Sequence, residues 1–196
     1  MPAGAPPVPE GLWDFYPFRW RDELLAGHYR DRALVCFYPV MRAVSLRAAG
    51  RLDSALLELQ RAWTMAPDAL WLPSQLSFAA RWLGFAASQK GDWGLAERAF
   101  RLALAAEPSL AETYEDLGTV CERTGRWEDA ESSYMKAVGL DPRSGKAYYN
   151  LGALYWGRAR WPEAAAAFSQ AAKLDPGNAA AAAFAAQAGR RARTSR

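Results

Sequence analysis

The chain has 196 residues, of which 51% are hydrophobic and 23% are charged, so it can bury a core and is not a disordered tail. No stretch approaches 18 consecutive apolar residues, and the opening MPAGAPPVPEG carries no positive charge. We therefore expect no transmembrane helix, secretory signal or transit peptide, and a cytoplasmic location, either free or as a soluble part of a membrane-associated complex. Two cysteines and one histidine exclude a disulfide framework and a Cys- or His-rich zinc site, so no metal is expected.

The net charge of +3 arises from the last seven residues, RRARTSR, which carry four arginines and no acid. The rest of the chain holds 20 basic and 21 acidic side chains, so it is electrically balanced. A basic stripe along the fold, which is typical of nucleic-acid-binding proteins, is therefore not expected. The tail is interpreted as a solvated end, and contact with nucleic acid or a membrane surface through its arginines is an alternative.

Internal repetition dominates residues 77–178. Seven positions recur at one fixed spacing and keep the same kind of residue in three consecutive copies. The sets are Leu83, Leu117 and Leu151; Gly84, Gly118 and Gly152; Trp93, Trp127 and Trp161; Ala96, Ala130 and Ala164; Phe100, Tyr134 and Phe168; Ala103, Ala137 and Ala171; and Pro108, Pro142 and Pro176. A constant period in the range of about 20–50 residues predicts a solenoid of stacked supersecondary units.

The pattern resembles the tetratricopeptide repeat family, whose units read W-x2-L-G-x2-Y, then A-x3-F, A and P. Unit 145–178 matches throughout if Tyr148 is allowed for Trp, and unit 111–144 departs only at Cys121, where the family has Tyr. Unit 77–110 has alanine at both aromatic positions. The resemblance implies an all-α helical solenoid, a right-handed superhelix of helix-turn-helix pairs with a C-terminal capping helix.

The resemblance implies helix pairs at 77–90 with 93–106, 111–124 with 127–140, and 145–158 with 161–174. Upstream, 36–69 is interpreted as a degenerate unit whose first helix starts near residue 22 and is kinked or broken near Pro39. The insertion 70–76 either lengthens the next helix or forms a loop. The expected divisions are a Pro- and aromatic-rich arm 1–21, a helix plus degenerate repeat 22–69, the insertion 70–76, repeats 77–110, 111–144 and 145–178, and a capping helix with basic tail 179–196.

Small residues mark close contacts and turns. The recurring glycine at 84, 118 and 152 lets another helix approach its backbone. Gly91 and Gly125 end first helices, where a left-handed backbone is often needed. Ala159 stands at the third such position, so we expect a shifted or differently shaped turn there. Asn178 is expected to cap a final helix that ends at Gly189.

The sequence offers little for catalysis. No glycine-rich phosphate motif is present, and His28 with Asp31 lacks a third group for a triad. Cys121 stands in a packing column and is interpreted as a small buried residue. We therefore expect no enzyme activity, no catalytic residue, no cofactor and no small-molecule substrate.

By resemblance, the first helix of each unit lines a concave groove that binds protein segments. The expected partner-binding residues are Arg81, Phe85, Gln89, Glu112, Glu115, Thr119, Glu122, Lys146, Tyr149, Asn150 and Trp156. The acidic middle of this groove favours a basic or amphipathic partner. Glu115 and Asp116 stand where the carboxylate clamp of co-chaperone repeats needs a cation or amide, so an acidic chaperone tail is disfavoured.

The expected function is a non-enzymatic adaptor or scaffold that binds a peptide or helix of a partner protein. One alternative is a regulatory or docking domain of a larger enzyme or membrane-associated machine. Residues 12–20, LWDFYPFRW, hold five aromatics in nine positions and are too apolar to stay in water. They are expected to cover an exposed face as an N-cap, to occupy the groove as a partner mimic, or to mediate self-association or assembly.

Overall fold

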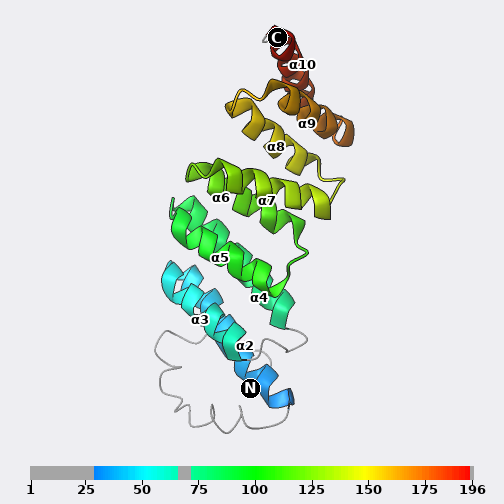
Figure 1. The fold of residues 1–196 in the computed structure, drawn as a ribbon. Coiled ribbons are helices and arrows are strands. Elements are labelled where there is room, and N and C mark those ends of the chain that lie inside the picture. Colours follow the sequence, from blue (N-terminus) through cyan, green and yellow to red (C-terminus); the bar gives the residue numbers. More distant parts are fainter. Residues whose placement is uncertain (1–28, 66–71, 195–196) are drawn as a thin grey trace.

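A computed structural model describes residues 29–65 and 72–194, which form helices and, within these ranges, no strand. The helices are α2 (Tyr29–Ala48), α3 (Leu52–Met65), α4 (Leu72–Gln89), α5 (Trp93–Ala106), α6 (Ala111–Arg123), α7 (Trp127–Leu140), α8 (Gly145–Gly157), α9 (Trp161–Leu174) and α10 (Ala179–Thr194). They follow one another along an elongated molecule, from α2 and α3 at one end to α10 at the other (Figure 1). None of these described helices is both long and apolar enough to cross a membrane.

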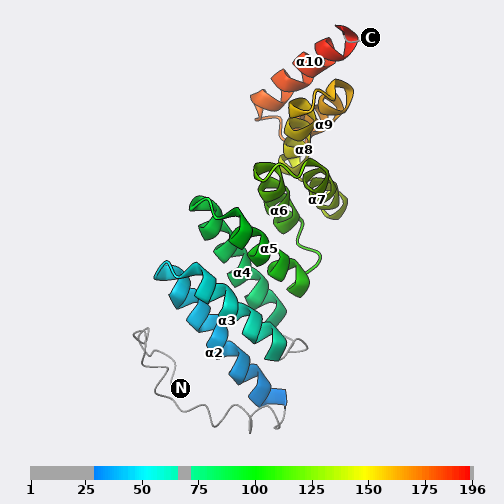
Figure 2. The same cartoon turned by 60° about the vertical axis from the view of Figure 1, so that its left-hand side comes forward.

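Consecutive helices pack as pairs, α2 with α3, α4 with α5, α6 with α7 and α8 with α9, and α10 packs on α9. The same stacking of pairs is visible from a second direction (Figure 2). The predicted helix pairs between residues 77 and 174 are therefore present, which confirms the all-α solenoid. Of the two expectations for the insertion, the first holds for the described residues, because α4 begins at Leu72.

The contact between the two helices of each pair depends on the recurring glycine. A Cβ on this residue would collide with an aromatic ring of the second helix, which is buried. The Cβ would lie 2.5 Å from Phe100 at Gly84, 2.5 Å from Tyr134 at Gly118 and 2.8 Å from Phe168 at Gly152. The predicted close approach is confirmed in all three pairs.

The turns inside the pairs share one geometry. Gly91 and Gly125 have φ of +76° and +75°, as the sequence predicts. Ala159 adopts φ of +55° at the equivalent place, although it is not glycine. The expectation of a shifted turn is wrong, because α8 and α9 are separated like the other pairs and the packing of Gly152 on Phe168 fixes their register.

The two ends of the described chain differ from expectation. α2 is one helix from Tyr29 to Ala48 with Pro39 inside it, so the helix is not broken there, and residues 22–28 lie outside the described ranges. The Asn178 side chain accepts a hydrogen bond from the Ala181 N–H at 3.1 Å, which confirms the predicted cap. α10 does not end at Gly189 but continues to Thr194, because the residues around that glycine are strong helix formers.

Candidate binding surface

The first helices α4, α6 and α8 carry all eleven residues predicted to line the groove. The three helices do not present these residues in the same way. Several charged members are paired within the chain, and two aromatic members are covered by α10. The surface is therefore best described one helix at a time.

Arg81 of α4 is bound by two acids of α6. Its Nε donates to an Asp116 carboxylate oxygen at 2.9 Å, and its Nη1 donates to Glu112. Asp116 is buried, and desolvation raises its pKa even though Arg81 acts in the opposite direction. The charge of Arg81 is thus used to hold α6 against α4.

The other two predicted residues of α4 differ in exposure. Phe85 is half-buried, because its ring packs edge-on against Phe100 of α5 with centroids 5.8 Å apart. Gln89, at the end of the helix, is exposed. Phe85 therefore contributes mainly to the packing of the pair, whereas Gln89 is accessible.

Glu115 of α6 is one of the most buried polar residues of the described chain, with 2% of its surface exposed. Its carboxylate lies 2.9 Å from Lys146 Nζ and accepts a hydrogen bond from the Ser144 hydroxyl at 2.7 Å. The predicted acidic centre of the groove is therefore turned inward and neutralised. Glu115 cannot serve as an exposed contact for a basic partner.

The remaining predicted residues of α6 have polar surroundings. Glu122 accepts a hydrogen bond from the Tyr134 hydroxyl at 3.1 Å, and burial raises the pKa of that tyrosine. Thr119 is exposed and donates to the Glu115 carbonyl at 3.1 Å. This middle part of the groove offers hydroxyl and carboxylate groups that already have partners in the chain.

The aromatic residues predicted on α8 are covered by α10. Tyr149 and Trp156 contact Phe184, with ring centroids 6.4 and 5.5 Å away. The Arg191 guanidinium lies 4.9 Å from the Trp156 ring and 4.7 Å from the Trp161 ring, so one arginine of the tail contacts the cap although its side chain is exposed. Asn150, the fourth predicted residue of α8, is half-buried.

Several large apolar side chains on α2 and α4 are exposed, and we call this set the N-terminal stripe. Its members are the exposed side chains Phe37, Met41, Val44, Phe78 and Trp82. Phe78 is 64% exposed and Trp82 is 49% exposed, and their ring centroids are 6.0 Å apart. The Arg47 guanidinium lies 6.0 Å from the Trp82 ring at one end of the stripe.

The α2 half of the stripe was missed by the sequence reasoning. Its residues Phe37, Met41 and Val44 precede Phe78, Trp82 and Phe85 by one constant spacing, which is the repeat period plus the insertion 70–76. Extending the groove columns through the degenerate unit would have found them. The weak match of that unit to the family pattern concealed the correspondence.

Two series of ion pairs join successive units. The inner ladder lies in the predicted groove and consists of Arg81 with Glu112 and Lys146 with Glu115. The outer ladder lies outside the groove and consists of Arg126 with Glu97 and Arg160 with Glu131. Both ladders therefore connect unit 77–110 to unit 111–144, and unit 111–144 to unit 145–178, through charged side chains.

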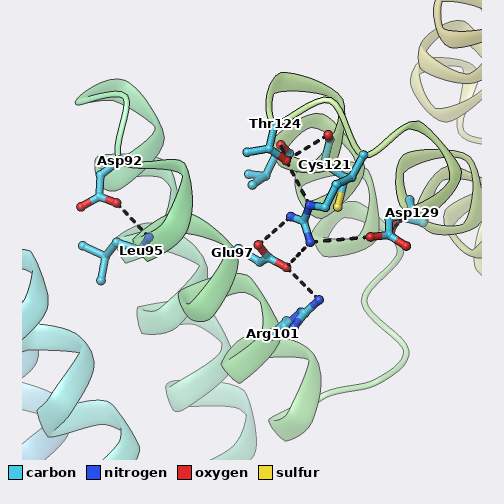
Figure 3. A network of polar contacts seen from close by, with 10 residues as sticks. Asp92, Leu95, Glu97, Arg101, Cys121, Thr124 and Asp129 are labelled. Atoms are coloured by element: carbon cyan, nitrogen blue, oxygen red, sulfur yellow. Dashed lines mark hydrogen bonds and ion pairs between the residues drawn. The ribbon is translucent and has the colours of Figure 1, made fainter.

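The outer ladder is well formed in its first step. Arg126, in the turn before α7, donates to both Glu97 carboxylate oxygens at 2.9 and 2.6 Å, and Arg101 also pairs with Glu97 (Figure 3). These hydrogen bonds lower the pKa of Glu97. Arg160 and Glu131 repeat the pair one unit later at 2.8 Å.

No group of three potential ligands among His, Cys, Asp and Glu occurs in the described ranges. Cys121 is buried as predicted, and desolvation raises the pKa of its thiol, which disfavours the reactive thiolate. His28 lies outside the described residues.

Comparisons with known proteins agree with this architecture. Residues 109–176 match the model of the tetratricopeptide repeat family. The structure of the MamA protein is similar with a TM-score of 0.64 at 18% identity, covering 80% of this chain and 81% of that one. The first tetratricopeptide domain of Spaghetti (RPAP3), bound to the HSP90 peptide SRMEEVD, has a TM-score of 0.55 at 20% identity over 58% and 90%.

The Arabidopsis OM64 tetratricopeptide domain has a TM-score of 0.55 at 25% identity, covering 58% of this chain and 94% of that one. No curated protein sequence shows significant similarity to the chain.

Proposed function

We propose that the chain is a non-enzymatic scaffold that binds an apolar or amphipathic segment of a partner protein on the N-terminal stripe, because residues 109–176 match the tetratricopeptide repeat family and the fold is similar to solved domains of that family. Solved domains of the same fold include one that holds a peptide. The same stripe would serve a free adaptor or the docking part of a larger machine.

The exposure of the stripe is the observation that carries the proposal. Phe78, Trp82 and Met41 each expose close to half or more of their surface, and they lie on two first helices that pack against each other. Contiguous exposed apolar surface commonly marks a binding site, and tryptophan is enriched among residues that dominate binding energy. The equivalent surface on α8 is covered by α10, so it offers less for a partner.

The charges narrow the chemistry of the partner. The peptide named with the RPAP3 domain, SRMEEVD, is acidic. Here the cations Arg81 and Lys146 are already paired with acids of α6, so they provide no carboxylate clamp. The same pairs neutralise most of the acids that favoured a basic partner, which leaves an apolar or amphipathic segment as the better match.

A peptide selection tests the proposal. Random peptides displayed on phage are selected on the full chain, and a recovered peptide is synthesised with a fluorescent label for anisotropy titrations. Phe78→Ser with Trp82→Ser should weaken its affinity about tenfold or more, because aromatic hot spots commonly contribute at least about 1.4 kcal/mol. Leu57→Ser with Met135→Ser is the matched control, since those side chains are 49% and 56% exposed on second helices.

Circular dichroism should show both double variants folded, because all four side chains are exposed. If no peptide is enriched, or if the selected peptides bind both double variants equally well, the stripe is not the binding site.

A further inference from the structure

We propose that residues 12–20 of the same chain, LWDFYPFRW, bind the N-terminal stripe and compete there with a partner. This inference rests on the proposed function of the stripe. The segment lies outside the described residues, and its composition, its distance along the chain and the chemistry of the surface that it would cover support the contact.

The segment and the stripe match in chemistry. Five of the nine residues of the segment are aromatic, and its two charges, Asp14 and Arg19, cancel. The stripe consists of aromatic and aliphatic side chains. Two cations on the same helices are engaged, since Arg47 lies over Trp82 and Arg81 is paired with acids of α6. A neutral aromatic segment therefore buries apolar surface against the stripe without separating any of these contacts.

The connection along the chain is long enough. Met41 lies in α2 about 18 Å from the Tyr29 end of the helix, given a rise of about 1.5 Å per residue. The nine peptide units from residue 20 to residue 29 span up to about 30 Å when extended. The segment can therefore reach back along α2 to Met41 and Val44.

Attachment to the same chain favours this occupant over a second copy. A tethered segment experiences an effective concentration on the order of 1 mM. Even an intrinsic dissociation constant of about 0.1 mM would keep the stripe about nine-tenths occupied and would weaken a competing peptide about tenfold. A second copy would have to reach a similar concentration to displace the tethered segment.

Trypsin cleavage after Arg19 in the full chain tests the contact, because a bound segment is cleaved only when it dissociates. The initial rate of this cleavage, followed by mass spectrometry, should rise about tenfold in the Phe78→Ser, Trp82→Ser variant, which exposes the segment. The Leu57→Ser, Met135→Ser control should match the parent. Equal rates in all three proteins would overturn the proposal.

The cleavage rate of the parent should be independent of protein concentration from about 1 to 100 µM, because the tether sets the local concentration. Protection that increases with concentration would instead assign the segment to the stripe of a second copy, and the intramolecular proposal would be wrong.

A competition experiment separates this inference from the proposed function. Phe15→Ser with Phe18→Ser in the full chain should tighten binding of the phage-selected peptide about tenfold. Unchanged affinity in this variant, together with loss of affinity in the Phe78→Ser, Trp82→Ser variant, would reject the segment as occupant and leave the peptide site in place.

Discussion

Ala159 occupies a backbone conformation that costs a residue with a side chain about 1 kcal/mol relative to glycine. Gly91 and Gly125 avoid this cost at the equivalent turns. The alanine is tolerated because the packing of α8 on α9 determines the turn, and because its side chain is exposed. This turn therefore contains strain that a single substitution can remove.

Ala159→Gly should stabilise the protein by about 0.5 kcal/mol. The substitution removes the strain of the left-handed backbone, and this gain is partly offset because glycine gives the unfolded chain more conformational freedom. Urea unfolding followed by circular dichroism measures the change. Gly125→Ala, the reverse exchange at the equivalent turn, should destabilise by about 1 kcal/mol. A loss of stability in Ala159→Gly would show that the strain is absent.

Glu115 is held by Lys146 and Ser144 and is shielded from water. Glu115→Lys should destabilise the protein by about 3 kcal/mol or more, because it places a cation at a buried position next to Lys146. Glu128→Lys is the matched control, since Glu128 has a side chain that is 86% exposed, and it should change stability by under about 0.5 kcal/mol. Equal unfolding midpoints for the two variants would show that Glu115 is not buried in solution.

Within each helix pair, stability depends on how closely the two helices approach. Gly118→Leu should destabilise by about 3 kcal/mol or more, because even its Cβ would lie 2.5 Å from the Tyr134 ring, and overpacking commonly costs about 1–3 kcal/mol for smaller conflicts. Gly139→Leu in α7 is the control, since no atom lies within 4 Å of a Cβ there and leucine favours the helix. A melting temperature of Gly118→Leu equal to or above that of Gly139→Leu would contradict the packing described.

The link between α5 and the turn before α7 should respond to pH. Arg126 lowers the pKa of Glu97 in the folded state, so this carboxylate contributes stability above its unfolded pKa of about 4.3 and loses it as the pH falls through the lowered value. Glu97→Gln removes this contribution. The variant should be about 1 kcal/mol less stable than the parent at pH 6, and the difference should shrink towards pH 3.

Urea unfolding at the two pH values measures this effect. Asp116, whose pKa is raised, makes the opposite contribution to the pH dependence of stability. This contribution is the same in parent and variant, so it cancels when the two proteins are compared. A difference between parent and variant that stays constant with pH would show that the Glu97 pair adds no net electrostatic stability.

The helix positions could be predicted because they depend on local packing that repeats in the sequence. The recurring glycine and its opposing aromatic ring determine each pair, and both are visible as columns. The end of α10 could not be predicted from Gly189 alone, because Phe184 and Arg191 hold the helix against α8 and α9. A single glycine costs about 1 kcal/mol in a helix, which such contacts outweigh.

The groove was less predictable than the helices. The family columns indicate which side chains point towards the concave side, but they do not indicate whether a neighbouring unit already binds them. The columns therefore assign Glu115 and Arg81 to a partner protein, whereas Lys146 binds Glu115 and Asp116 binds Arg81 within the chain. The sequence does contain a sign of these pairs. Arg81 precedes Glu112 by the same number of residues by which Glu115 precedes Lys146, and the two residues of each pair carry opposite charges.

At the scale of the whole molecule, the two charge ladders have different consequences for the order in which units can be joined. In the outer ladder every step pairs an arginine of the later unit with a glutamate of the earlier unit. Arg160 could therefore replace Arg126 opposite Glu97 if unit 111–144 were removed. In the inner ladder the signs alternate, because Arg81 faces Glu112 while Glu115 faces Lys146. The same removal would place Lys146 opposite Arg81.

Loss of one unit through recombination is therefore penalised even though it preserves the repeat period. A chain lacking 111–144 should gain about 1 kcal/mol of stability from Lys146→Glu, whereas the same substitution should destabilise the parent. Urea unfolding of the four proteins measures both effects, and equal responses would show that the signs do not matter. If the signs do matter, the alternating charges of the inner ladder favour the present order of the units and disfavour variants in which a unit has been duplicated or deleted.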